Sequence, residues 1–265
     1  MDQQNQQVLD TFFKDYQPED GFEIVLIIDR SGSMSSLTND VIGGLNTFIT
    51  EQQKEGGSHV SIVQFDHIYG DPQSWRTPVK EVPLFDGKSY SPRGSTALFD
   101  AIGRTISKMK EMKASGEVKG KVMFVIQTDG EENSSQEIRT KEQLTSLIDD
   151  ARNNEGWEFI FLGADLAAFN QGNSLGFAGQ NTTLVQKNAV GVNNSYVYAA
   201  AMTRGYRSDV KFCDGDIELM KSSTASGAAE TSQLMADVYS KLDEQIKSKI
   251  LSDNAADVDE KTDQN

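Results

Sequence analysis

Residues 24–33 read Ile-Val-Leu-Ile-Ile-Asp-Arg-Ser-Gly-Ser, an apolar run that leads directly into an Asp-x-Ser-x-Ser loop. A short run of branched apolar side chains is typical of a buried strand in a parallel sheet. Asp29, Ser31 and Ser33 then place one carboxylate and two hydroxyls on a single turn at the carboxyl end of that strand. Open α/β sheets bind ligands at this edge, and hard oxygen groups suit Mg²⁺, Mn²⁺ or Ca²⁺ rather than zinc or copper. These three side chains are therefore candidate metal ligands.

Two later segments carry oxygen side chains at comparable positions. The stretch 91–102, Ser-Pro-Arg-Gly-Ser-Thr-Ala-Leu-Phe-Asp-Ala-Ile, places Thr96 at the start of a helical pattern. The stretch 122–130, Val-Met-Phe-Val-Ile-Gln-Thr-Asp-Gly, is a second buried-type strand with Asp129 at its carboxyl end. If both strands run parallel in one sheet, their aspartates emerge at the same edge. Each residue also has an ordinary alternative role, because Ser and Thr cap helices while Asp and Gly form turns.

The order of these motifs resembles the metal-ion-dependent adhesion site of von Willebrand factor A domains, particularly the intracellular bacterial and phage members. The resemblance covers roughly residues 21–205. It implies a Rossmann-like fold and a protein-binding module without enzymatic activity, in which the metal bridges to a partner. It implies five metal ligands: Asp29, Ser31, Ser33, Thr96 and Asp129.

The ligand types predict how such an ion behaves. Two carboxylates and three neutral hydroxyls leave a divalent cation incompletely neutralised, so that an open position attracts an Asp or Glu of a protein partner. Hydroxyl-rich ligation favours Mg²⁺ or Mn²⁺ over Ca²⁺. Arg30 and Arg93 are candidate rim residues that steer the incoming carboxylate, or solvated side chains. Glu131, with Glu132, adds negative charge at the rim, and we expect this pair to begin a solvated helix.

Composition narrows the class of partner. The chain has 265 residues and a net charge of −15, which disfavours a nucleic-acid or anionic-membrane surface. Its apolar runs are too short for a membrane span, and its polar N-terminus does not resemble a secretory signal. Cys213 is the one cysteine, so no intrachain disulfide forms. We therefore expect a cytoplasmic protein, in a cell or in a virus-infected host cell.

Strands and helices alternate along the chain, which predicts an α/β fold with a doubly wound, mostly parallel central sheet flanked by helices. The expected strands are 22–28, 59–65, 77–82 at an edge, 121–127, 159–162 and 183–185. The expected helices are 38–54, 97–113, 141–153, 166–175 and 195–203. The organisation is an N-terminal extension with a short helix (1–20), the main domain (21–205), a loop region (206–229), an amphipathic C-terminal helix (230–251) and a disordered acidic tail (252–265).

The C-terminal helix supports an alternative function. Leu234, Val238, Leu242, Ile246 and Ile250 form an apolar stripe at a spacing of four residues. The stripe either packs back onto the domain or binds a partner or a second copy. In the second case the protein has a structural or assembly role. The resemblance also allows an adaptor of a MoxR-type AAA ATPase.

Enzymatic alternatives have weaker support. His59 and His67 are the two histidines, and neither accompanies a nucleophile motif; a P-loop is absent. A minor alternative is a Mg²⁺-dependent phosphoryl-transfer enzyme resembling haloacid-dehalogenase phosphatases. Those enzymes carry Asp-x-Asp at the first strand, whereas this chain has Ser31 at the second position and lacks that general acid. Lys121 begins a strand instead of ending one, which also disfavours a phosphate-contacting role.

Overall fold

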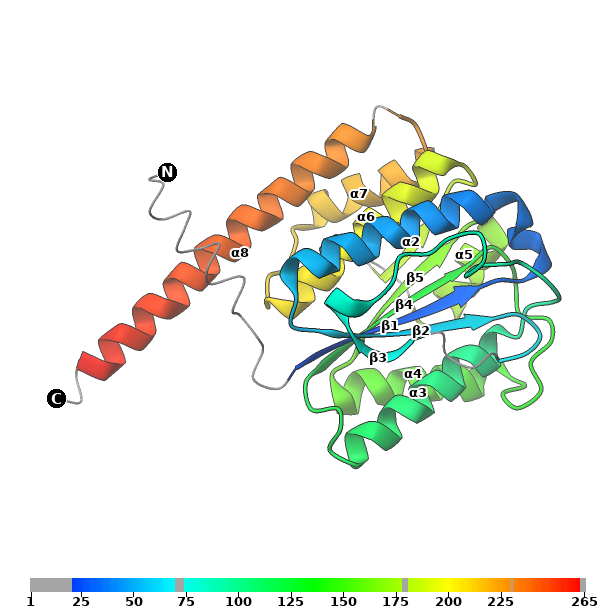
Figure 1. Ribbon diagram of the computed structural model, residues 1–265, viewed down its shortest axis with the longest axis horizontal. Helices are drawn as coiled ribbons and strands as arrows, with labels where there is room; N and C mark the ends of the chain where they lie inside the picture. The colour runs from blue at the N-terminus through cyan, green and yellow to red at the C-terminus, as the bar shows by residue number, and fades with distance from the viewer. Residues whose placement is uncertain (1–20, 70–73, 178–180, 230, 263–265) are drawn as a thin grey trace.

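The computed structural model describes residues 21–69, 74–177, 181–229 and 231–262. A six-stranded sheet lies between two layers of helices (Figure 1). The strands are β1 (Phe22–Asp29), β2 (His59–Phe65), β3 (Ser74–Pro78), β4 (Lys121–Thr128), β5 (Glu158–Gly163) and β6 (Thr182–Leu184). The α-helices are α2 (Thr38–Glu55), α3 (Leu98–Ala114), α4 (Lys141–Glu155), α5 (Leu166–Ser174), α6 (Ala189–Arg207), α7 (Asp214–Ser226) and α8 (Thr231–Thr262), with 3₁₀ turns η1 (Gly32–Leu37) and η2 (Val79–Glu81).

The strand order β3-β2-β1-β4-β5-β6 confirms the doubly wound, mostly parallel sheet. All neighbouring strands pair in parallel except β3, which runs antiparallel to β2 at the edge. The chain moves outward from β1 to β2 and β3, then returns through α3 to β4 on the other side of β1. The strand order therefore reverses between β1 and β4, which is where sheets of this type open a crevice for ligands.

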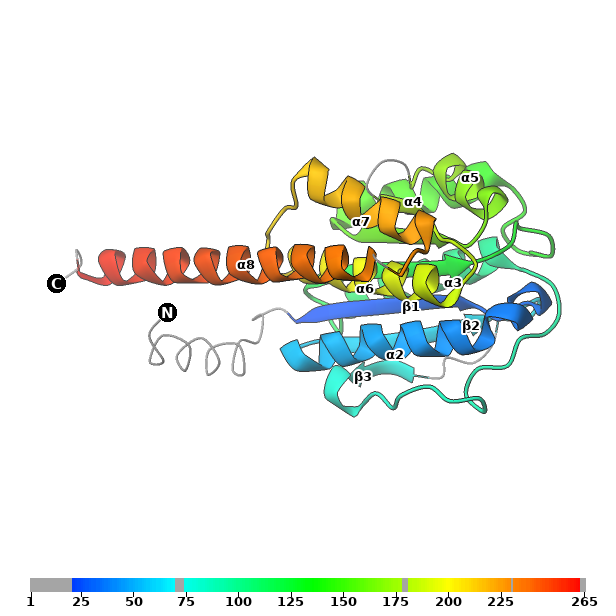
Figure 2. The ribbon, with the colours of Figure 1, turned by 90° about the horizontal axis from the view of Figure 1, so that it is seen from above.

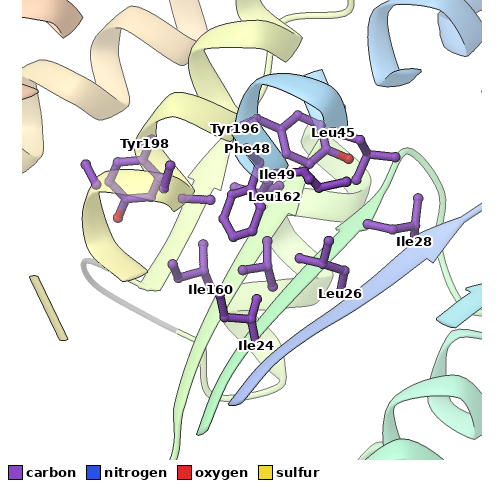
Figure 3. Packing of buried hydrophobic residues seen from close by; sticks show 14 of the residues in the cluster. Ile24, Leu26, Ile28, Leu45, Phe48, Ile49, Ile160, Leu162, Tyr196 and Tyr198 are labelled. Atoms are coloured by element: carbon purple, nitrogen blue, oxygen red, sulfur yellow. The ribbon is translucent and has the colours of Figure 1, made fainter. Parts of the chain in front are cut away.

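Alternate residues of β1 point to opposite faces and anchor two separate cores. Ile24, Leu26 and Ile28 face the layer of α2 and α6, and they pack there in a buried apolar cluster that includes aromatic side chains of both helices. Figure 3 shows this packing, with Leu45, Phe48 and Ile49 from α2, Ile160 and Leu162 from β5, and Tyr196 and Tyr198 from α6. The strand is buried on both faces, as the branched apolar run predicts.

The second core lies beneath α3 and α4, which cover the opposite face of the sheet (Figure 1). Val25 and Ile27 contribute from β1, and Phe124 and Phe159 stack in the middle with ring centroids 4.6 Å apart. Both faces of the central strands are thus dry and closely packed. Because the strands are held from both sides, the loops at their carboxyl ends start from fixed positions.

Two sheet-edge and helix boundaries differ from the sequence prediction. The expected strand 77–82 overlaps β3 only at residues 77 and 78: β3 begins at Ser74 and ends at Pro78, which has no N–H to donate to the ladder, and residues 79–81 form η2. Its edge position is confirmed. Helix α6 begins at Ala189, six residues before the predicted start of 195–203, because Asn188 caps it by accepting the N–H of Gly191 at 2.8 Å.

The predicted loop region 206–229 contains a helix, which corrects the sequence interpretation. Helix α7 buries Ile217 and Met220 against the domain, three residues apart on one face. Its other buried positions are polar: Ser223 and Thr224 donate their hydroxyls to backbone carbonyls, and Asp216 accepts an ammonium group from α8. Because polar side chains occupy these buried positions, the spacing of apolar residues did not predict the helix.

Helix α8 packs the central part of its apolar stripe back onto the domain, whereas the side chains of Leu234 and Ile250 lie outside what the structure describes. Val238, Leu242 and Ile246 are buried in the core that α6 and α7 share. The predicted end at 251 is too early, since α8 continues to Thr262 and takes in most of the tail predicted as disordered. No Gly or Pro interrupts 252–262, so nothing in the local sequence stops the helix. Figure 2 shows the C-terminal part of α8 running beyond the domain.

The predicted N-terminal extension, residues 1–20, lies outside the described residues. Within the described ranges, none of the helices combines the length and apolar character that crossing a membrane requires.

Candidate metal centre

Asp29 ends β1 at the point where the strand order reverses. Its carboxylate is fully buried and held from two directions: Oδ1 accepts the backbone N–H of Ser31 at 2.6 Å, and Oδ2 accepts the hydroxyl of Thr128 at 2.6 Å. The carbonyl of Asp29 also accepts the hydroxyl of Tyr90 at 2.7 Å. Asp29 is therefore fixed before any ligand arrives, and its bond to Thr128 ties the carboxyl end of β1 to that of β4.

Closely spaced oxygen atoms connect the loop after β1 with the loop after β4. The Oγ atoms of Ser31 and Ser33 lie 3.0 Å apart, and the Ser33 hydroxyl donates to Asp129 Oδ1 at 2.6 Å. Ser33 is exposed, whereas Ser31 and Asp129 are buried. Neighbouring ligands of an octahedral ion with bonds of 2.0–2.1 Å stand about 3 Å apart. The spacing of these oxygens therefore suits a small divalent cation.

Thr96 faces the same space from the loop before α3. A Cβ built on Gly130 lies 3.6 Å from Thr96 Oγ1 and 3.8 Å from Ser33 Oγ, so a side chain there would fill the gap between the two hydroxyls. The backbone N–H of Thr96 donates to Asn133 Oδ1 at 2.9 Å, which fixes this loop to the one after β4. The structure thus brings all five predicted ligands to one edge of the sheet.

Two buried carboxylates and one lysine set the electrostatics of this edge. Burial raises the pKa of Asp29 to about 6, and the nearby charge of Asp129 adds to the rise, although hydrogen bonds from Thr128 and Ser31 oppose it. Lys187 supplies one positive charge: its Nζ lies 3.1 Å from Asp129 Oδ2 and 3.3 Å from Asp165 Oδ2. Burial lowers the pKa of Lys187, but the hydrogen bond and charge of Asp129, with Asp165, produce a net rise.

The donor chemistry of this edge differs from that of a typical zinc site. In the portion of the chain that the structure describes, no three His, Cys, Asp or Glu side chains gather around a point that suits a metal. The carboxyl edge of the sheet at the switch point, where the strand order reverses between β1 and β4, instead offers two carboxylates and three hydroxyls. All of these are hard oxygen donors. The residues present therefore fit Mg²⁺ or Mn²⁺.

The predicted rim residues have different environments. Arg30 and Arg93 both contact Asp66, with Nε to Oδ2 distances of 3.1 and 2.8 Å. Glu131 is exposed beside the site. Glu132 does not begin a solvated helix as expected: its carboxylate accepts the N–H of Phe99 at 2.8 Å and those of two residues in its own loop, so that it caps α3 instead.

Comparison with protein families agrees with this geometry. The family model described as the von Willebrand factor type A domain matches residues 23–195. The chain belongs to the von Willebrand factor type A (vWA) family. Domains of this family are generally adhesion or interaction modules, and they often mediate metal-dependent protein interactions. None of the curated proteins compared with this vWA chain matches it.

Solved structures match this vWA chain at low sequence identity. The PilB minor pilin from Streptococcus sanguinis matches with a TM-score of 0.52 and 10% identity, covering 74% of this chain and 64% of the pilin, so this chain spans less than two thirds of that relative. The vWF domain of the type V pili tip protein Mfa5 from Porphyromonas gingivalis gives 0.48 and 11%, covering 73% and 97%. The manganese-loaded TRAP protein from Plasmodium vivax gives 0.42 and 14%, covering 67% and 73%.

Sequence reasoning missed four residues that shape the vWA site. Thr128 and Tyr90 hold Asp29 in place, and Lys187 contacts Asp129. Asp66 gathers the two rim arginines. The sequence contained a signal for Thr128 and Asp66, because each directly follows a predicted strand. Lys187 also follows a predicted strand, 183–185, but that strand is short and lies at the sheet edge, so its contact with Asp129 is not evident from the sequence.

Proposed function

We propose that this vWA domain is a divalent-cation-dependent protein-binding module that performs no chemistry itself. The cation is held by Asp29, Ser31, Ser33, Thr96 and Asp129, and its open position takes an Asp or Glu side chain from a partner protein. One observation carries the proposal: the Ser33 hydroxyl lies within hydrogen-bonding distance of both Ser31 Oγ and Asp129 Oδ1, which come from different strands at the switch point.

The chain's own residues explain why the site binds without a large ordering cost. Asp29 is held by Ser31 and Thr128, and Thr96 is held by Asn133, so these loops are ordered by the fold. When bound, a divalent ion supplies a positive centre that two carboxylates and three hydroxyls do not fully neutralise. An anionic side chain of a partner completes the charge balance.

The choice of ion and the absence of a reaction step rest on residue types. Closely spaced hydroxyls suit the short bonds of Mg²⁺ or Mn²⁺ better than the larger shell of Ca²⁺. Ser31 stands where the phosphatase alternative requires an acid, and a serine hydroxyl does not donate a proton as a carboxylic acid does. Assembly through α8 is disfavoured because its buried stripe already contacts the domain.

Thermal unfolding of Ser33→Ala tests the proposal, with Ser36→Ala as the matched control. Both serines are exposed and lie on the same 3₁₀ turn, but Ser33 alone contacts Asp129. An ion at 100 times its dissociation constant stabilises a protein by about 2.7 kcal/mol, which raises Tm by roughly 5–10 °C. We expect Mg²⁺ and Mn²⁺ to produce this rise over EDTA in the wild type and Ser36→Ala, and a much smaller one in Ser33→Ala. An equal rise in all three proteins would place the ion elsewhere.

A further inference from the structure

Arg30 and Arg93 converge on one buried carboxylate beside the candidate metal centre. Both donate through Nε to the same atom, Asp66 Oδ2. The other oxygen of Asp66 accepts the backbone N–H of Ile68 at 2.8 Å and lies 3.2 Å from His67 Nδ1. Asp66 is therefore saturated. Each guanidinium has four further N–H donors on its two terminal nitrogens. The Arg30 side chain is 20% exposed and that of Arg93 more so.

Backbone hydrogen bonds fix the two arginines to the rim of the metal site. Arg30 lies between two of the proposed ligands in the sequence, and its N–H donates to the carbonyl of Phe65 at 2.8 Å. The N–H of Arg93 donates to the carbonyl of Arg30 at 2.7 Å, and that of Gly32 donates to Gly94 at 2.9 Å. The loop that carries Arg93 is therefore paired directly with the metal-binding loop.

The charge on this side of the rim exceeds what folding needs. One arginine is enough to neutralise Asp66, yet the site holds two, and the Arg93 side chain is 58% exposed. This surplus positive charge stands on a chain with a net charge of −15. The positive and negative charges of the rim lie on opposite sides of the switch point. The arginines lie on the side of β1 and β2, whereas Glu131 follows β4 on the other side.

We propose that Arg30 and Arg93 form a basic subsite for a second carboxylate of the partner, which is therefore a peptide segment with two nearby carboxylates. This inference rests on the proposed function. The first carboxylate occupies the open position of the ion, and the second accepts charge-assisted hydrogen bonds from the terminal nitrogens of Arg93 and Arg30. Planar guanidinium groups suit such two-point recognition of a carboxylate. Asp66 acts as a positioning residue that holds both arginines.

Synthetic peptides provide the probe. Eight-residue, C-terminally amidated peptides with no Asp, with one Asp, or with two Asp separated by one or two residues are titrated into the wild-type protein and followed by NMR. The titration is run in Mg²⁺ and again in EDTA. We expect two-carboxylate peptides to bind about tenfold more tightly than the one-carboxylate peptide in Mg²⁺, since a charge-assisted bond contributes about that factor. Equal affinities, or no binding of the two-carboxylate peptides, would overturn the subsite.

Arg93→Gln isolates the subsite from the ion. Arg30 remains to neutralise Asp66 in this variant, so the fold is retained. We expect the preference for two carboxylates to be lost while the Mg²⁺-induced rise in Tm is unchanged, because Arg93 is not one of the proposed metal ligands. Arg104→Gln is the matched control: it removes the same charge from an exposed ion pair on α3, with Glu137. A preference that persists in Arg93→Gln would refute the subsite, whereas wild-type binding that is unaffected by EDTA would refute the metal-dependent function instead.

Discussion

The two ends of β1 and β2 each hold a buried acid, but they use it differently. At the amino end, Glu23 Oε1 accepts both Nε and Nη2 of Arg76, at 3.1 and 2.9 Å. At the carboxyl end, Asp66 Oδ2 accepts one contact from each of Arg30 and Arg93. At the amino end, one arginine donates two hydrogen bonds to one carboxylate. At the carboxyl end, two arginines donate one hydrogen bond each to a shared carboxylate oxygen.

This difference separates a structural ion pair from a surface suited to a ligand. Arg76 belongs to β3, so its pair with Glu23 closes the edge of the sheet and leaves no surplus charge on that pair. Arg30 and Arg93 belong to loops at the edge where the strand order reverses, beside Asp29 and Asp129. The pair at the amino end closes the sheet edge, whereas the two arginines at the carboxyl end are the groups to which the proposed subsite assigns the second carboxylate.

The largest expected effect comes from breaking the pair at the amino end. Glu23→Gln leaves Arg76 without its counter-charge in a largely buried position. Removing one partner of a buried ion pair costs about 3 kcal/mol, so the urea midpoint should fall substantially. The Mg²⁺-induced rise in Tm should be unchanged, because the metal centre lies at the other end of the strands. Loss of the ion response in this variant would contradict the separation of the two ends.

Breaking the carboxyl end should give the opposite pattern. Asp129→Asn removes the charge of one of the two proposed carboxylate ligands, while its amide oxygen still accepts the hydroxyl of Ser33. We expect the Mg²⁺-induced stabilisation of about 2.7 kcal/mol, at 100 times the dissociation constant, to be largely lost. In EDTA, the variant should unfold within a few degrees of the wild type. Calorimetric unfolding with and without Mg²⁺ measures both quantities, and a full ion response would exclude Asp129 as a ligand.

The Asp66 cluster predicts a pH dependence of smaller size. Burial favours the protonated form of Asp66, but hydrogen bonds from Arg93 and Ile68, with the charges of both arginines, hold its pKa below its ordinary value of 3.8. The folded protein then binds fewer protons at this group than the unfolded chain. Its stabilising contribution is present above the unfolded pKa and is lost as the pH falls through the folded pKa.

Asp66→Asn measures that contribution directly. The difference in free energy of unfolding between the wild type and the variant should be constant from about pH 7 to pH 5 and should shrink below about pH 4. Urea unfolding at a series of pH values in EDTA provides the curve. A difference that stays constant down to about pH 2.5 would show that the carboxylate charge is not what holds the two arginines.

The central fold and the oxygen-rich edge were accessible from sequence for physical reasons. Buried parallel strands are nearly all apolar, so 24–28 and 122–126 stood out, and the residues that follow such strands share an edge whatever the loops do. The structure brings Asp29, Ser31 and Asp129 together as predicted. Helix α7 was not predictable in the same way, because satisfied Ser and Thr side chains fill positions where apolar residues mark an ordinary buried face.

Long-range contacts that join separate segments were the part that sequence could not supply. The pairing of Arg93 with Arg30, and of both with Asp66, depends on how the loop before α3 folds over the end of β2. Lys187 is a sharper case. It follows an edge strand of three residues, in a stretch without helical or strand periodicity, and reaches the site only because β6 lies beside β5.

Lys187 yields the smallest expected effect and the finest test of the carboxyl end. Its ammonium contacts Asp129 and Asp165, so it supplies positive charge where the ion is proposed to bind. Lys187→Met should therefore tighten Mn²⁺ binding by about three- to tenfold, since a unit charge within several ångströms of a divalent ion opposes it by about 1 kcal/mol after solvent screening. Lys141→Met, at an exposed position, is the control. Calorimetric titration with Mn²⁺ gives both affinities. Weaker binding in Lys187→Met would mean that the lysine orders Asp129 for the ion instead of competing with it, and the carboxyl end would then depend on its cations for shape as much as for charge.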